Sequence, residues 1–529
     1  MTLKLAPKNK VFLYVIFAII NALGNVTVAY TSKIMLDLAQ YRKGKLNDLI
    51  LVACVGAGTI ILIMLANFIY RYIKVDLVRT INVVLKDKTM TYLVNKRDVS
   101  QKDGLSLMTN DLKQIETLKV TNELMIISEL VSFVISIVVG ILNSWILTLI
   151  FLATTLIPGF VQKWFAKPIQ KRSGQWEKAN AEYTQKVSDA LNGSRTTNLY
   201  DAQVPVISQV VESAKRMELA LRRLNYAQQG AYEIIVAVAD IFSFIIPFLV
   251  GSILMYQGWF GAGTLIMIVQ LSNQFVNPIV NIFDQINAIK STKPMWDKIE
   301  PALTYNFVAS HEFSDILEEL EITDVSYTVN GRQLFNNLSL KIEPGQKVLL
   351  MAPSGWGKTT FLQLLMGQLK PSHGQVIINH KDMSGNYQEA HNFFGYINQR
   401  PFIFDNNLKF NLTLGREVLN ADLSEAIKLA GLSELVAEKG LDYELGEAGS
   451  NLSGGQIQRI EIARALLFKR PILLADEATS ALDPAMSLAI HKTLLNNKDI
   501  TVLEVAHKIT DDETKMFDRI VHLDELVAE

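Results

Sequence analysis

Long apolar runs separated by polar segments fill roughly the first 300 residues and are absent from the rest of the chain. Most of these runs approach the roughly 20 residues that a membrane-spanning helix needs, although the fourth run is shorter. The runs are residues 11–30, 49–70, 124–142, 145–161, 234–256 and 264–286. Only Asn143 and Ser144 separate the third run from the fourth, which predicts a tight helical hairpin. The pattern therefore predicts six transmembrane helices.

The pattern changes near Glu300 and Pro301, where the last long helix should end. Beyond this point, short apolar strands alternate with helical stretches, as they do in α/β domains. We therefore expect an all-α membrane domain of six transmembrane helices in residues 1–300, with long cytoplasmic helical loops. A separate α/β domain is expected in residues 301–529.

The composition supports a membrane protein. Hydrophobic residues make up 49% of the chain and charged residues 19%, whereas an average soluble domain carries about 25% charge. The low charged fraction and the positive mean hydropathy exclude a disordered chain and a nucleic-acid binder built on bulk positive charge, so no nucleic-acid partner is expected. The net charge of −1 adds nothing about partners. The single cysteine, Cys54, excludes a disulfide framework within the chain and a cysteine-based zinc site. Because Cys54 lies in an apolar run, we expect it to be a small buried hydrophobic residue.

The distribution of Lys and Arg predicts the orientation in the membrane. These residues are concentrated in segments 71–123 and 162–233, whereas the connections 143–144 and 257–263 contain none. Cytoplasmic loops carry the excess of positive charge, so both long segments and both termini are expected in the cytoplasm. The first outer loop, which contains Lys33, opposes the rule but is outweighed by the other connections. We expect an integral protein of the plasma membrane whose long helical loops reach a cytoplasmic domain and couple to it mechanically.

A glycine-containing loop in the second half predicts a phosphate-binding site and hence an α/β P-loop NTPase domain. The loop follows an apolar strand at 346–351 and precedes a helical stretch at 361–369, which is the context that such a loop requires. Backbone N–H groups at a helix N-terminus attract phosphate. Lys358 can reach the β- and γ-phosphates and the Thr359 hydroxyl can ligate Mg²⁺, while Ala352 replaces the usual first glycine. The expected nucleotide contacts are Ser354, Gly355, Trp356, Gly357, Lys358, Thr359 and Thr360.

Two further motifs complete the expected nucleotide chemistry. The buried-strand pattern at 471–475 ends in Asp476, a candidate metal-supporting acid, and Glu477, which can accept a proton from an attacking water or position that water. The second motif precedes a helix, and Ser453 with the following glycine amides can form another anion site. Its residues are Leu452, Ser453, Gly454, Gly455 and Gln456.

With this last motif just before the acidic strand, the sequence resembles the ATP-binding cassette (ABC) transporter family. The resemblance implies that Tyr327 stacks on adenine and that Gln399 contacts Mg²⁺ and the membrane domain. It also implies that Asp483, in the loop 480–483, signals between two sites and that His507 contacts the γ-phosphate. ATP and Mg²⁺ are the expected ligands, with Thr359, Gln399 and Asp476 around the metal and Glu477, His507 and Gln399 in catalysis.

The resemblance covers nearly the whole chain, because six spans followed by one cassette resemble an exporter-type half-transporter. Segments Asp103–Asp111 and Gly446–Gly449 resemble the family's first cytoplasmic-loop motif and the exporter segment that touches coupling helices. The resemblance implies that two chains pair, with each ATP between one chain's phosphate loop and the other's signature. The intact Glu477 and signature favour a homodimer, and a heterodimer remains open.

Amide side chains line one face of the sixth span, which suggests where a substrate passes. Amides in a membrane helix avoid lipid, so this face should line a polar cavity or bond to another helix. A cavity would suit a substrate with hydrogen-bonding groups, such as a peptide, and a lipid or drug-like molecule remains open. The candidate residues are Gln270, Asn273, Gln274, Asn277, Asn281 and Asp284, with Asp240 in the fifth span.

The expected function is ATP-driven export by alternating access, with an ATPase coupled to transmembrane transport. An importer with an exporter-like fold, of the siderophore kind, would share every motif named. A soluble P-loop ATPase would need no detergent for extraction. A channel or receptor gated by ATP would not require Glu477, so measurable ATP turnover would separate it from a transporter.

Overall fold

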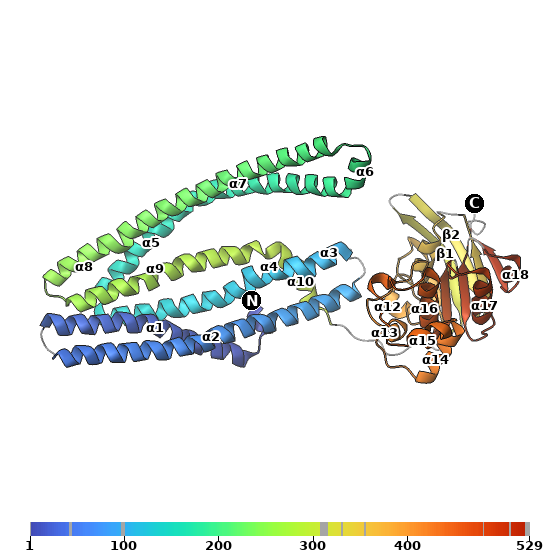
Figure 1. The fold of residues 1–529 in the computed structure, drawn as a ribbon, viewed down its shortest axis with the longest axis horizontal. Coiled ribbons are helices and arrows are strands. Elements are labelled where there is room, and N and C mark those ends of the chain that lie inside the picture. The colour runs from blue at the N-terminus through green and yellow to red at the C-terminus, as the bar shows by residue number, and fades with distance from the viewer. Residues whose placement is uncertain are drawn as a thin grey trace. The chain divides into compact units, whose positions relative to one another are not determined.

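The computed structural model describes residues 2–41, 45–96, 101–306, 316–329, 332–353, 356–479, 481–506 and 509–523. The chain divides into two compact units, residues 1–307 and residues 308–529 (Figure 1). The described part of the first unit is helical and that of the second unit contains two sheets surrounded by helices. This is the predicted combination of a helical membrane domain and an α/β domain.

Helices build the described part of the first unit, and their lengths range from 4 to 72 residues. They are α1 (Lys8–Tyr41), α2 (Leu46–Asn95), α3 (Gln101–Ser106), α4 (Leu112–Ile115), α5 (Thr121–Asn192), α6 (Ser194–Leu199), α7 (Gln203–Asp240), α8 (Ile246–Tyr256), α9 (Ala262–Ser291) and α10 (Lys293–Thr304). Within the described residues, five helical stretches are long and apolar enough to cross a membrane: 8–40, 46–95, 103–154, 203–256 and 262–291. The fourth predicted span lies in α5, where several side chains fall outside the described residues, so the count of six stays a prediction.

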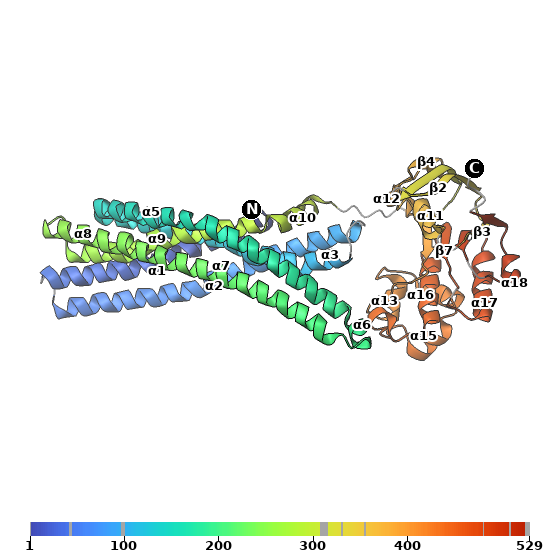
Figure 2. The ribbon, with the colours of Figure 1, turned by 90° about the horizontal axis from the view of Figure 1, so that it is seen from above.

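The chain reverses inside α5, as the sequence predicts. Ser144 is extended, with φ −162° and ψ 99°. A Cβ atom on Gly140 would lie 2.8 Å from the hydroxyl of Thr148, eight residues later, so the two halves run back along each other. The second half of α5 then runs beside α7 toward α6 in both views (Figures 1 and 2). Lys33 lies within α1 rather than in a loop, and its Nζ donates to Asn143 at this reversal over 2.6 Å.

Helices α1 and α2 approach closely at small residues. A Cβ on Gly24 would lie 2.9 Å from Ile63, and one on Gly56 would lie 2.7 Å from the methyl of Thr31. The other side of α2 is apolar and exposed, as expected of a surface that meets lipid. Cys54 is exposed on this helix, so the expectation of a buried cysteine is wrong. An apolar run does not by itself distinguish a core-facing position from a lipid-facing one.

The second unit holds an antiparallel sheet of order β2-β1-β4-β5 and a parallel sheet of order β6-β7-β8-β3-β9. The strands are β1 (Leu320–Val329), β2 (Arg332–Ile342), β3 (Lys347–Met351), β4 (His373–Ile378), β5 (Lys381–Asp382), β6 (Phe394–Ile397), β7 (Ile472–Asp476), β8 (Thr501–Val505) and β9 (Arg519–His522). The helices are α11 (Lys358–Leu365), α12 (Tyr387–Ala390), α13 (Leu408–Thr413), α14 (Asn420–Leu429), α15 (Ser433–Lys439), α16 (Gly454–Leu467), α17 (Pro484–Leu495) and α18 (Asp511–Thr514).

Burial of the central strands positions the functional loops. Every residue of β7 and β8 is buried, as is typical of a parallel sheet covered on both faces. Strands β7, β8 and β3 are neighbours and run parallel, so their carboxyl ends meet at one edge. In open α/β sheets, ligands bind at this edge. The phosphate loop follows β3, and Glu477 follows β7.

Replacing Gly56 with Val tests the close packing of α1 on α2. Even the Cβ atom would collide with Thr31, whose hydroxyl donates to the carbonyl of Thr27 over 2.8 Å. We expect overpacking of about 1–3 kcal/mol and a lower melting temperature of the detergent-purified protein. Gly58→Val is the matched control, because a Cβ there meets nothing within 4 Å. Equal melting temperatures for the two variants would contradict this packing.

Candidate functional site

The phosphate loop brings Lys358 to the start of α11. Gly357 has a φ of 106°, and a Cβ there would lie 3.1 Å from the ring of Phe335, so this position favours glycine twice over. The Nζ of Lys358 donates to the carbonyls of Ala352 and Pro353, both at 3.1 Å. Burial lowers the pKa of Lys358, and the charges of Glu477 and Asp476 oppose this shift. The predicted contacts Ser354 and Gly355 lie outside the described residues.

Asp476 and Thr359 come together at the end of β7. The Thr359 hydroxyl donates to Asp476 Oδ2 over 2.9 Å. Burial raises the pKa of Asp476, and the hydrogen bond from Thr359 opposes that shift. A hydroxyl and a carboxylate are hard oxygen ligands of the kind that Mg²⁺ prefers, so this pair fits the metal. Thr360 follows on the same helix and is half-buried.

Glu477 has a left-handed backbone that three hydrogen bonds hold in place. Its φ is 55°, which is uncommon for a residue other than glycine. Its N–H donates to the carbonyl of Val505 over 2.9 Å, and its own carbonyl accepts from Gln458 over 2.9 Å. Its carboxylate accepts from Gln399 Nε2 over 2.8 Å. The candidate catalytic acid and Gln399 are therefore in contact.

The signature motif caps α16. Ser453 Oγ accepts from the N–H of Gln456 over 3.3 Å, and Gln456 Oε1 accepts from the N–H of Ser453 over 2.8 Å. This reciprocal capping box fixes the first turn, whose residues begin with Gly454 and Gly455. Leu452 packs against the hydrophobic core below. The glycine N–H groups at the start of a helix of 14 residues suit a phosphate group.

Gln458 is a bridging residue that the motif analysis did not single out. Besides its bond to Glu477, its Oε1 accepts from the N–H of Ala481 over 2.9 Å. Gln458 therefore connects the signature helix α16 to Glu477 and to the loop that leads to Asp483. A polar residue at a buried position two residues beyond the signature is the signal that could have found it. Tyr396 was also missed, and its hydroxyl donates to Asp476 over 3.4 Å.

The remaining cassette candidates lie around this centre. Asp483 caps α17, where its Oδ1 accepts from Met486 N–H over 3.0 Å. Tyr327 lies on β1 and packs, half-buried, against the core. The Trp356 ring lies 4.9 Å from that of Phe335, which pairs with Tyr327 across the sheet, so an aromatic group adjoins the phosphate loop. His507 and Ser480 lie outside the described residues.

The amide face of α9 divides into two rows. One row bonds to neighbouring helices: Gln270 donates to Ser32 over 3.4 Å, Asn281 donates to Glu129 over 3.0 Å, and Gln274 accepts from Ser132 over 2.9 Å. The second row comprises Asn273, Asn277 and Asp284, which are exposed, as are Gln270 and Asn281 of the first row. Asp240 is exposed at the end of α7, where a π-helical turn follows. The interpretation as interhelical hydrogen bonding therefore holds for the first row, and the cavity stays a prediction for the second.

Comparison with known families identifies the chain. The profile of the ABC transporter transmembrane region matches residues 11–279, which is about half of the chain, and the ABC transporter profile matches residues 335–480. The chain therefore belongs to the ABC transporter family, with one transmembrane region and one ATP-binding domain. It is an ATPase coupled to transport.

Individual relatives agree with this assignment. The chain is 25% identical to the uncharacterized ABC transporter ATP-binding protein YfiC of Bacillus subtilis, over 77% of this chain and 69% of that protein. A Rickettsia felis protein whose name assigns it provisionally to export ATP-binding/permease proteins is 27% identical, over 86% of this chain and 82% of its own length. The structure of a bacterial Atm1-family ABC exporter with ATP bound shares the fold, with a TM-score of 0.76 and 18% identity over 99% of this chain and 94% of the other.

Replacing Thr359 with Val tests whether the hydroxyl of Thr359 and the carboxylate of Asp476 form the Mg²⁺ site. Without its hydroxyl, the donor to Asp476 and the candidate metal ligand are both lost. We expect the apparent affinity for Mg²⁺ in an ATPase titration to fall by roughly tenfold or more, as for the loss of a hydrogen bond to a charged group. Thr359→Ser keeps the hydroxyl and should remain close to the parent. An unchanged Mg²⁺ requirement in Thr359→Val would remove Thr359 from the metal site.

Proposed function

We propose that this chain is an exporter that works as a homodimer in the plasma membrane, with its cassettes and termini in the cytoplasm. Each ATP would lie between the phosphate loop of one chain and the signature of the other. Closure of the cassettes would open the cavity outward, and hydrolysis would reset it. The observation that carries this proposal is the linked pair of contacts, Thr359 to Asp476 and Gln399 to Glu477, in a chain that also has an intact signature.

Each residue has a separate task in hydrolysis. Lys358 and the N–H groups of α11 would bind the phosphates. Thr359, Asp476 and Gln399 would hold Mg²⁺, which neutralises phosphate charge when bound. Glu477 would orient the attacking water and accept its proton, with Gln399 fixing its carboxylate. His507 would contact the γ-phosphate, as the family resemblance implies.

Transport in oriented vesicles tests the proposal. The purified protein would be reconstituted with its cassettes outside, given ATP and Mg²⁺, and tested for ATPase stimulation by panels of peptides, lipids, drugs and metal chelates. A stimulating compound should then accumulate inside the vesicles. Accumulation only in vesicles of the opposite orientation, with ATP supplied inside them, would make the protein an importer. Passive flux that requires bound ATP but no turnover would make it a channel.

Replacing Glu477 with Gln should abolish sustained hydrolysis while ATP still binds. The amide keeps the size of the carboxylate but cannot accept a proton, so turnover should fall on the order of 10²- to 10⁴-fold. Phosphate release and binding of a fluorescent ATP analogue would measure the two effects separately. Glu425→Gln, at an exposed position on α14, is the matched control and should behave as the parent. Parental turnover in Glu477→Gln would assign the base to another residue.

The exposed row of α9 is our proposed substrate path, with Asp240 as a further candidate. Asn273 and Asn277 would meet a substrate that forms hydrogen bonds, such as a peptide. Gln270, Gln274 and Asn281 would support this row, since their side chains already bond to α1 and α5. Pro278 interrupts α9 between the two ends of the row and leaves the carbonyl of Gln274 without its helical N–H donor.

Cysteine labelling tests the path. In a Cys54→Ala background, cysteines at Asn273 and Asn277 should react with a charged thiol reagent roughly tenfold faster than one at Ile268, because the reagent needs a thiolate in water. Ile268 is fully buried and is the control. A cysteine at Asn281 should react more slowly than one at Asn277, because the carboxylate of Glu129, which Asn281 contacts, disfavours a nearby thiolate. ATP with vanadate should change the labelling, and equal labelling of all positions would contradict the path.

A further inference from the structure

A buried charged cluster in the second unit lines the same cavity as Glu477. It consists of His491 on α17, Glu504 on β8 and Glu513 on α18, whose exposed fractions are 2%, 1% and 4%. Buried ionisable side chains are rare unless they are paired. Neither nucleotide binding nor proton transfer, as described above, uses these three residues.

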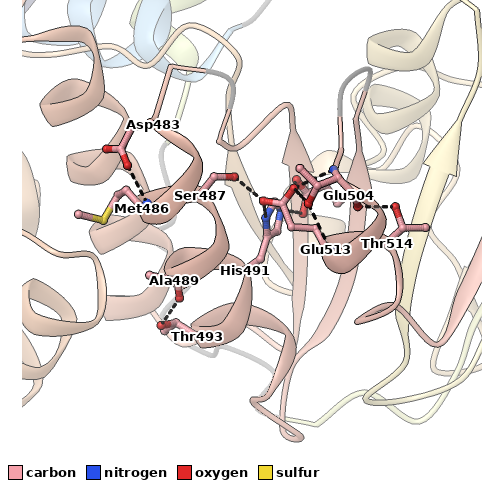
Figure 3. A network of polar contacts seen from close by, with 10 residues as sticks. Asp483, Met486, Ser487, Ala489, His491, Thr493, Glu504, Glu513 and Thr514 are labelled. Atoms are coloured by element: carbon pink, nitrogen blue, oxygen red, sulfur yellow. Dashed lines mark hydrogen bonds and ion pairs between the residues drawn. The ribbon is translucent and has the colours of Figure 1, made fainter.

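The imidazole of His491 bridges two carboxylates (Figure 3). Its Nδ1 lies 2.9 Å from Glu513 Oε1, and its Nε2 lies 3.0 Å from Glu504 Oε1. An ionised carboxylate only accepts hydrogen bonds, so both ring nitrogens carry a proton and the ring is cationic. Burial alone would lower the pKa of His491, but the hydrogen bonds and charges of Glu504 and Glu513 outweigh it and raise the pKa to about 9.

Glu513 has further donors. Ser487 Oγ donates to it over 2.7 Å, and the N–H and hydroxyl of Thr510 donate over 2.9 and 2.8 Å. Burial alone would raise the pKa of Glu513, but these bonds and the His491 ring lower it to about 2. Among the described residues, the charged groups facing the ring are therefore Glu504 from β8 and Glu513 from α18. The uncharged ring of Phe517 packs edge-on, at 6.2 Å between centroids.

The cluster is attached to the hydrolytic residues in two ways. Helix α17, which carries His491, begins directly after its cap Asp483. Strand β8 continues from Glu504 to Val505, whose carbonyl accepts from the N–H of Glu477 over 2.9 Å. Glu477, His491 and Glu504 also line one cavity of about 540 Å³. Val505 on β8 therefore holds the N–H of Glu477, and the chain that follows Glu477 leads to Asp483 at the start of α17. A shift of α17 relative to β8 would displace these two attachments of Glu477 relative to each other.

We propose that His491, Glu504 and Glu513 form a positioning network for ATP hydrolysis, in which the cationic ring pins α17 to β8 and so fixes the backbone of Glu477. This inference rests on the proposed role of Glu477. The hydrogen bonds of the network join α17, β8, Thr510 and α18, so the network should act on turnover and leave the affinity for ATP unchanged. It would also keep the loop that ends at Asp483 in a fixed position relative to Glu477.

The network predicts an alkaline limit on turnover. It is complete while His491 is protonated and both carboxylates are ionised, and the His491 pKa of about 9 sets its alkaline limit. As the pH rises through about 9, the ring loses a proton and one carboxylate loses its donor, so kcat should fall. A weakened hold on the phosphates would instead appear as a higher KM for ATP. In Glu504→Gln, one of the two charges that hold the proton is gone, so the fall in kcat should begin at lower pH.

The experiment measures kcat and KM for ATP between about pH 6 and pH 10 with the full-length protein in nanodiscs. The variants are Glu504→Gln, His491→Gln and the control His380→Gln, which changes an exposed histidine that lies 2.7 Å from Glu319. The parent and the control should lose kcat near pH 9. Below the alkaline fall of the parent, His491→Gln should be slower by roughly tenfold; it should show no alkaline fall of its own and keep an unchanged KM.

The outcomes separate this inference from the proposed function. A parental kcat that stays level through pH 9, or a Glu504→Gln profile that matches the parent, would overturn the network. If His491→Gln binds no ATP because it does not fold, the parent and Glu504→Gln still decide the question. Parental turnover in Glu477→Gln would instead overturn the proposed role of Glu477, whatever the pH profile.

Discussion

The left-handed backbone of Glu477 is the constraint on which the rest of the cassette depends. Such a conformation costs about 1–3 kcal/mol and persists only when the surroundings enforce it. Here the surroundings are β8 through Val505, the signature helix through Gln458, and the segment after β6 through Gln399. A displacement of any one of these elements changes the geometry of the acid. The conformation of one residue thus connects the proposed catalytic acid to the signature helix and to Gln399.

The parallel sheet makes this arrangement possible. Because β3, β7 and β8 are neighbours, the phosphate loop, the two acids and the segment after β8 all begin at one edge. At that edge, Asp476 accepts hydrogen bonds from Thr359 and Tyr396. The buried cluster of His491, Glu504 and Glu513 is what we propose fixes the backbone of Glu477. Buried ion pairs add little net stability, so the cluster around His491 is better understood as a means of fixing positions.

The membrane domain is subject to a different constraint, because its polar side chains must avoid lipid. On α9, three amides bond to α1 and α5, and Asn273 and Asn277 lie on the adjacent row. The bonded row holds the helix, and the adjacent row is the one that we propose meets the substrate. Glycines between α1 and α2 allow a close approach that larger side chains would prevent. The same helical face therefore serves both packing and the proposed transport.

The sequence by itself determined the membrane class, the hairpin at Ser144 and the order of the cassette motifs. These features depend on local hydrophobicity and on short runs of residues with fixed backbone needs. Only the tertiary structure decided that Cys54 is exposed, that the amide face of α9 has two rows, and that Gln458 and Val505 hold Glu477. The bridge from His491 to Glu504 and Glu513 joins residues 13 and 22 positions apart on different elements. Such contacts arise from packing between elements, which no local pattern encodes.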